Sequence, residues 1–116
     1  MGIESLDPED VARWLAERSI VLIDVREPTE YGAERIRGAL LFPLSTFDPK
    51  ALPDPGKRKI VFHCGSGVRS AKAVARCQDA GLAVDSHLKG GLQAWKAAKL
   101  PTLRQDPETG QLHEGE

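Results

Sequence analysis

The chain has few of the features that mark specialised classes of protein. Its 116 residues include only two cysteines, Cys64 and Cys77, which are too few for a disulfide scaffold and favour a reduced, cytoplasmic compartment. No stretch approaches the roughly 20 apolar residues that a membrane helix needs, and residues 1–7 lack the basic and apolar regions of a secretory signal. No spacing of His, Cys, Asp and Glu resembles a zinc site, so neither a metal nor another cofactor is expected.

The charge balance is nearly neutral, with 16 Lys and Arg against 17 Asp and Glu and a net charge of −1. Such a balance argues against bulk electrostatic binding to nucleic acid or to an anionic membrane. The 41% hydrophobic and 28% charged residues are typical of one soluble globular domain, which we place at residues 1–103. Residues 104–116 contain a single apolar residue, Leu112, and are expected to form a mobile polar tail.

Short apolar runs alternate with helical patterns along the chain, which predicts an α/β fold with a parallel sheet. The predicted strands are residues 20–23, 39–42, 60–62 and 84–88. The predicted helices are one that begins at Pro8 after an Asp7 N-cap, and three more over residues 27–33, 70–80 and 92–98. The proline-rich residues 44–59 are expected to form a loop with one helical turn.

Residues 60–71 are the segment most typical of a catalytic or binding site. In this segment a predicted buried strand is followed by a small glycine-containing loop and then by a helix. Cys64 opens this loop at the carboxyl end of the strand, where open α/β sheets place their sites. The backbone N–H groups and the positive helix end form an anion-binding nest, and Arg69 adds a planar fork of donors. The residues of the predicted cradle are Gly65, Ser66, Gly67, Val68 and Arg69.

The same field would stabilise a thiolate, so Cys64 is predicted to be a nucleophile. The alternative is that Cys64 is a small buried hydrophobe at a strand end. Cys77 lies seven residues beyond Ser70, roughly 10 Å along a helix, and is interpreted as a core cysteine rather than a disulfide partner or resolving thiol. His63 is expected to point into packing, although its ring can also tune Cys64.

Three motifs give the chain a resemblance to a single-domain rhodanese, a sulfurtransferase of the thiosulfate type. They are LIDVREPTEY at residues 22–31 with IRGA at 36–39, CGSGVRSA at 64–71, and LKGGLQAW at 88–95. Their order and spacing cover nearly everything except the tail. The resemblance implies a rhodanese-like α/β fold with a mostly parallel five-stranded sheet and helices on both faces.

The resemblance also implies a mechanism. Cys64 would attack the outer sulfur of a small anionic donor such as thiosulfate, become a persulfide inside the loop, and pass the sulfur to cyanide, a thiol or a sulfur-carrier protein. Asp24 and Ser70 would support the loop. For Asp24 the alternative is a surface salt bridge with Arg26 or Arg37.

The chain departs from the usual pattern at two points, and two other functions stay open. Glu34 and Arg35 stand where the family usually has Gly-His, and Ala98-Lys99 stands where it often has Ala-Gly. These changes leave the substrate preference open. A phosphatase or arsenate reductase of the same fold is one rival, but its loop has five residues between Cys and Arg, against four here. A non-catalytic binding or regulatory module is the other.

Overall fold

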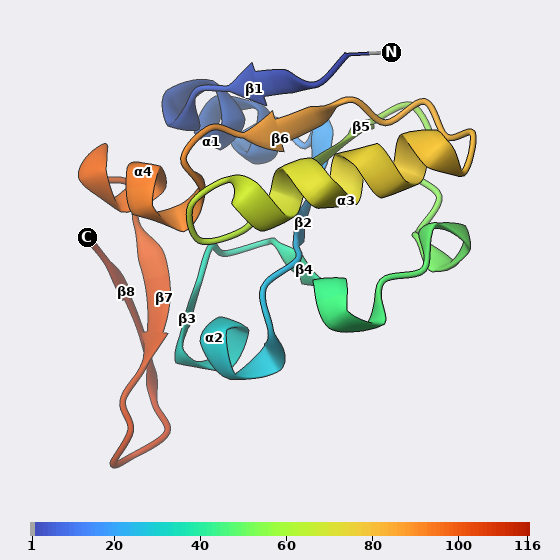
Figure 1. Ribbon diagram of the computed structural model, residues 1–116. Helices are drawn as coiled ribbons and strands as arrows, with labels where there is room; N and C mark the ends of the chain where they lie inside the picture. The colour runs from blue at the N-terminus through green and yellow to red at the C-terminus, as the bar shows by residue number, and fades with distance from the viewer. Residues whose placement is uncertain (1) are drawn as a thin grey trace.

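The centre of the protein is a five-stranded sheet in which every strand runs in the same direction. The computed structural model describes residues 2–116. The strand order is β1-β6-β5-β2-β4, and all the pairs are parallel (Figure 1). The strands are β1 (Glu4–Leu6), β2 (Ile20–Asp24), β4 (Leu40–Leu41), β5 (Lys59–His63) and β6 (Ser86–Leu88). The predicted five-stranded α/β fold is therefore confirmed.

Helices cover both faces of this sheet. They are α1 (Pro8–Ala16), α2 (Pro28–Ala33), α3 (Val68–Asp79) and α4 (Gly91–Ala97), with short 3₁₀ turns η1 (Leu44–Thr46) and η2 (Pro49–Ala51). Successive side chains of a strand point to opposite faces of the sheet, so the central strands contribute to two hydrophobic cores, one on each face. Leu22 and Val61 pack with α1 and α4, whereas Ile23 and Phe62 pack with α3.

The two central strands place two polar residues side by side at their carboxyl ends. β2 and β5 pair in register so that Asp24 lies opposite His63, and both side chains are fully buried. Cys64 follows His63 at the same edge of the sheet. Parallel strands end together, so this register brings the polar end of β2 next to the cysteine loop.

The C-terminal segment has more structure than the sequence indicates. Residues 104–116 were expected to be a mobile tail, but the structure forms β7 (Thr102–Gln105) and β8 (Leu112–Gly115) there. This hairpin pairs antiparallel with β3 (Glu34–Arg35) to make a second sheet of order β3-β7-β8 (Figure 1). Glu34 holds the hairpin in place by accepting a hydrogen bond from the Thr102 hydroxyl of β7. It also forms an ion pair with Lys96 of α4.

Other elements also differ from the sequence prediction. β1 was not predicted, because a three-residue edge strand with two exposed positions carries no apolar run. α3 begins at Val68, two residues earlier than the predicted helix, and the residue-44–59 loop holds two 3₁₀ turns rather than one. Within residues 2–116, no helix combines the length and the apolar character needed to cross a membrane.

Candidate active site

Cys64 lies at the bottom of a tight loop between β5 and α3. Its side chain has no exposed surface. The loop closes at Gly67, whose φ of 105° is in the left-handed region that favours glycine, and α3 begins at the next residue. This backbone path turns the N–H groups of Ser66 and Gly67 toward the sulfur, in the manner of an anion-binding nest.

The thiol sulfur is the point on which these donors converge. The backbone N–H of Gly67 lies 3.1 Å from Cys64 Sγ, and the N–H of Ser70, in the first turn of α3, lies 3.3 Å away. The Ser70 hydroxyl is 3.6 Å from the same sulfur. The structure thus brings the predicted supporting residue Ser70 into direct contact with the predicted nucleophile.

The two cysteines have opposite shifts of pKa. Burial of the Cys64 thiol raises its pKa, but the Ser70 hydroxyl and N–H and the N–H groups of Gly67 and Ser66 outweigh it, so that the net pKa of Cys64 is lowered. Burial without such donors raises the pKa of Cys77 to about 11. Both thiols are free and buried, so the environment rather than the exposure separates them. The interpretation of Cys64 as a simple buried hydrophobe does not account for these contacts.

A chain of hydrogen bonds continues from Ser70 across the sheet, and sequence reasoning missed it. Ser70 Oγ lies 2.8 Å from His87 Nδ1, and His87 Nε2 lies 3.1 Å from Ser5 Oγ on β1. Burial lowers the pKa of His87 and so favours its neutral imidazole. The only sequence signal was a histidine one residue before the Leu-Lys-Gly-Gly motif, in a strand next to β5.

The start of α4 holds the cysteine loop from the other side. The N–H of Leu92 donates to the Cys64 carbonyl at 2.8 Å, and the N–H of Gln93 donates to the Gly65 carbonyl at 3.0 Å. A side chain at Gly91 would clash with the backbone of Cys64 and Gly65. These contacts give the third sequence motif a physical reason, because the loop and the helix start share one close packing surface.

Arg69 does not lie open in the cradle as the sequence suggested. Its guanidinium makes a two-pronged ion pair with Glu30 of α2, at 2.7 and 3.0 Å. Hydrogen bonds from Arg69 lower the pKa of Glu30 to about 2. Both side chains remain about one-third exposed, and Arg69 lies close to Gly65. The pair is therefore at the surface beside the cysteine loop, a position that we call the mouth of the site.

Asp24 reaches the loop indirectly. Its carboxylate forms a buried ion pair with Arg26 at 2.8 Å, and its Oδ2 lies 3.3 Å from His63 Nε2. The other ring nitrogen of His63 is 3.1 Å from the Cys64 carbonyl. The alternative of a surface salt bridge is wrong on two counts, because the Arg26 pair is buried and Arg37 binds Glu114 instead.

Hydrogen bonds hold Asp24 in its charged form. Burial raises the pKa of this carboxyl, but the nearby His63 ring and the hydrogen bonds from Arg26 more than offset that effect and lower it to about 2. The first motif therefore contributes a fixed buried charge beneath the loop, not a group that contacts the sulfur.

Comparison with known proteins identifies the family. Residues 7–98 match the rhodanese-like domain. The chain belongs to this family. It is similar to a sulfurtransferase of Allochromatium vinosum, with 31% identity over 87% of this chain and 95% of that protein. The solution structure of a rhodanese-like domain from Anabaena superposes with a TM-score of 0.75 and 29% identity, covering 92% of this chain and 83% of that one.

Some relatives are longer than this rhodanese-like domain. The probable adenylyltransferase/sulfurtransferase MoeZ of Mycobacterium tuberculosis is 37% identical over 85% of this chain, which spans only 26% of the MoeZ sequence. The chain spans 56% of another curated relative with the same identity. The resemblance drawn from the three motifs is confirmed at the level of the family.

Replacing Asp24 tests its support of the loop. Asp24→Asn should destabilise the fold by roughly 3–5 kcal/mol, because it leaves the Arg26 charge buried without a partner. Urea denaturation at neutral pH measures the loss. The exposed Asp10→Asn variant, which removes only a surface pair with Arg13, is the matched control and should lose at most about 1 kcal/mol.

The same charge should make the fold sensitive to acid. The pKa of Asp24 is about 2 in the fold against an ordinary 3.8, so its stabilisation is fully present above pH 3.8 and is lost as the pH falls through 2. The shift corresponds to about 2 kcal/mol. The gap in unfolding free energy between wild type and Asp24→Asn should therefore narrow by about 2 kcal/mol across this range. A gap between them that stays constant with pH would contradict the assignment.

Proposed function

We propose that this domain is a sulfurtransferase of the thiosulfate type that works through a persulfide on Cys64. The observation that carries the proposal is the convergence of the Gly67 N–H and the Ser70 N–H on one sulfur atom, with the Ser70 hydroxyl oxygen 3.6 Å from it. Such donors favour a thiolate at neutral pH and equally favour the negative charge of a persulfide. Relatives named sulfurtransferases support the same class of reaction.

The reaction would proceed in two steps of covalent catalysis. The Cys64 thiolate attacks the outer sulfur of thiosulfate, a new S–S bond forms, and the old S–S bond breaks so that sulfite leaves with its electron pair. In the second step a thiophilic acceptor attacks the outer persulfide sulfur and regenerates the thiolate. No bound metal or cofactor takes part in either step of this proposal.

The chemistry of the site suggests which molecules donate and accept the sulfur. Thiosulfate is a small anion that suits a nest of N–H groups at a helix start. Cyanide, a small thiol or a sulfur-carrier protein would accept the sulfur, and a reducing cytoplasmic setting would keep both cysteines as thiols. Neither nucleic acid nor a membrane surface is among the proposed partners, given the net charge of −1.

The loss of the Cys64 thiol tests the proposal directly. Thiosulfate treatment followed by intact-protein mass spectrometry should show one added sulfur atom on wild type and on Cys77→Ser, and none on Cys64→Ser. Cys64→Ser should also lose thiosulfate:cyanide turnover while its circular dichroism is unchanged, because a hydroxyl cannot form a persulfide.

Three results would count against it. Turnover by Cys64→Ser above a trace would move the nucleophile elsewhere. A folded wild-type domain that takes up no sulfur would favour a binding module. Hydrolysis of a phosphate ester that depends on Cys64, without any sulfur adduct, would favour the phosphatase alternative.

The ion pair at the mouth gives a second test. Arg69→Ala should raise KM for thiosulfate and lower kcat/KM about 10- to 100-fold, as expected for loss of a charge-assisted hydrogen bond of roughly 1.5–3 kcal/mol. Arg69→Lys should retain only part of the wild-type kcat/KM, because an ammonium group lacks the planar fork of donors that a guanidinium has. Steady-state kinetics at fixed ionic strength measure both.

Glu30→Gln is the matched partner variant. It weakens the hold on Arg69 and removes a negative charge at the mouth, so KM for the dianionic donor should fall. If Glu30→Gln instead raised KM as much as Arg69→Ala does, the pair would act only to hold α2 against α3. Arg69 would then have no direct contact with the donor.

A further inference from the structure

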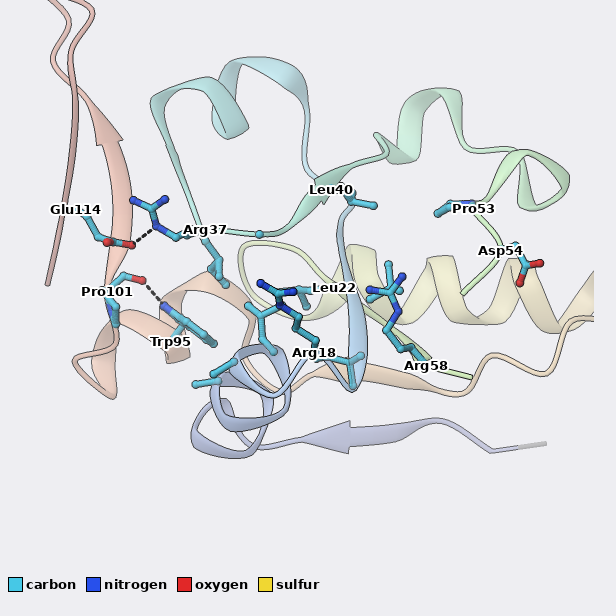
Figure 2. Close-up of a pocket in the computed structure, with 17 residues that line it drawn as sticks. Arg18, Leu22, Arg37, Leu40, Pro53, Asp54, Arg58, Trp95, Pro101 and Glu114 are labelled. Carbon is cyan, nitrogen blue, oxygen red and sulfur yellow. Dashed lines mark hydrogen bonds and ion pairs between the residues drawn. The ribbon is translucent and has the colours of Figure 1, made fainter. Parts of the chain in front are cut away.

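A cavity lies on the face of the sheet opposite α3, away from the cysteine loop. It has a volume of about 770 Å³ and opens between α1 and the β2–β4 edge (Figure 2). None of residues 64–70 lines it. The proposed sulfur transfer makes no use of this space, and a molecule bound there would not touch Cys64.

The floor of the cavity is apolar. Leu22 of β2, Ile36 and Trp95 of α4 line it with almost fully buried side chains, and Leu15 of α1 lines it as well. Leu40, on the edge strand β4, also lines it and is 49% exposed. The edge therefore presents a large apolar side chain to solvent beside an apolar surface, which is a common property of ligand pockets.

Two arginine side chains, those of Arg18 and Arg58, lie beside this apolar surface without protein partners. Arg18 follows α1 and Arg58 precedes β5, and Figure 2 shows both guanidinium groups in the space between α1 and Leu40. Within residues 2–116, neither guanidinium has an ion pair or a side-chain hydrogen bond. The third arginine of the lining, Arg37, is already held by Glu114.

We propose that this cavity binds a small amphipathic anion, with an apolar body on the floor and a carboxylate, sulfonate or phosphate at Arg18 and Arg58. The guanidinium fork matches the oxygens of each of these groups. Asp54, the acidic residue on the same side, accepts a hydrogen bond from the Gly56 N–H and does not pair with either arginine. Inorganic phosphate or sulfate alone would leave the apolar floor uncovered.

The size favours a small molecule over a protein surface. A volume of about 770 Å³ falls within the range of roughly 300–1,000 Å³ that is typical of small-molecule sites. The lining comes from several segments rather than from one flat face, so a compact ligand can contact all of them. A second copy of this chain on the β4 edge is the main alternative occupant.

A pair of matched fluorescent probes tests the proposal. 8-Anilinonaphthalene-1-sulfonate carries the apolar body and the anion, and N-phenyl-1-naphthylamine carries the same body without the charge. The sulfonate should bind wild type with one site, and Arg18→Ala combined with Arg58→Ala should weaken it about tenfold or more. The neutral probe should bind wild type and this double variant equally.

The controls separate this site from the rest of the molecule. Leu40→Asp should weaken both probes, Lys72→Ala on the opposite face should weaken neither, and Cys64→Ser should bind the sulfonate as wild type does. Failure of the proposed sulfur transfer would thus leave this binding unchanged. Circular dichroism of each variant checks the fold.

Three outcomes would overturn the proposal. The first is sulfonate binding that survives the double arginine change. The second is equal loss of binding in Lys72→Ala. The third is a wild-type dimer in sedimentation that Leu40→Asp converts to a monomer, which would make the surface an interface between copies of the chain.

Discussion

The site depends on keeping a buried sulfur surrounded by N–H donors. Burial alone disfavours the Cys64 thiolate, and the fixed donors of the loop reverse the effect, so the lowered pKa depends on the shape of the loop. Two hydrogen bonds from the start of α4, to the carbonyls of Cys64 and Gly65, hold the loop in that shape. The close approach at Gly91 explains why the loop and the Gly-Gly motif act as one unit.

A buried charge supports the same loop from beneath. Asp24 is held by Arg26, and the His63 ring lies between the carboxylate and the Cys64 carbonyl. Burying such a pair is costly unless its hydrogen bonds are made, and Arg26 reaches both carboxylate oxygens. The carbonyl of Cys64 is thus contacted from β5 and from α4, which leaves the N–H groups of the loop to face the sulfur.

The sequence was informative where the signal is local. The β-branched run of β2, the Cys-Gly-Ser-Gly loop and the start of α3 were predicted to within two residues, because strand and turn propensities act over short distances. The Ser70–His87 contact and the Arg69–Glu30 pair were not, since each joins residues far apart in the chain. The C-terminal hairpin was missed because its strands are polar and depend on pairing with β3.

The most direct measurement of this account is the pKa of the Cys64 thiol, obtained from the pH dependence of its alkylation by iodoacetamide in the Cys77→Ser background. The account predicts a pKa below that of a free cysteine, and a rise in Ser70→Ala, which removes the side-chain hydrogen bond that lowers the Cys64 pKa and keeps the backbone N–H. A Cys64 that titrates at or above the free-cysteine pKa, with no change in Ser70→Ala, would contradict it.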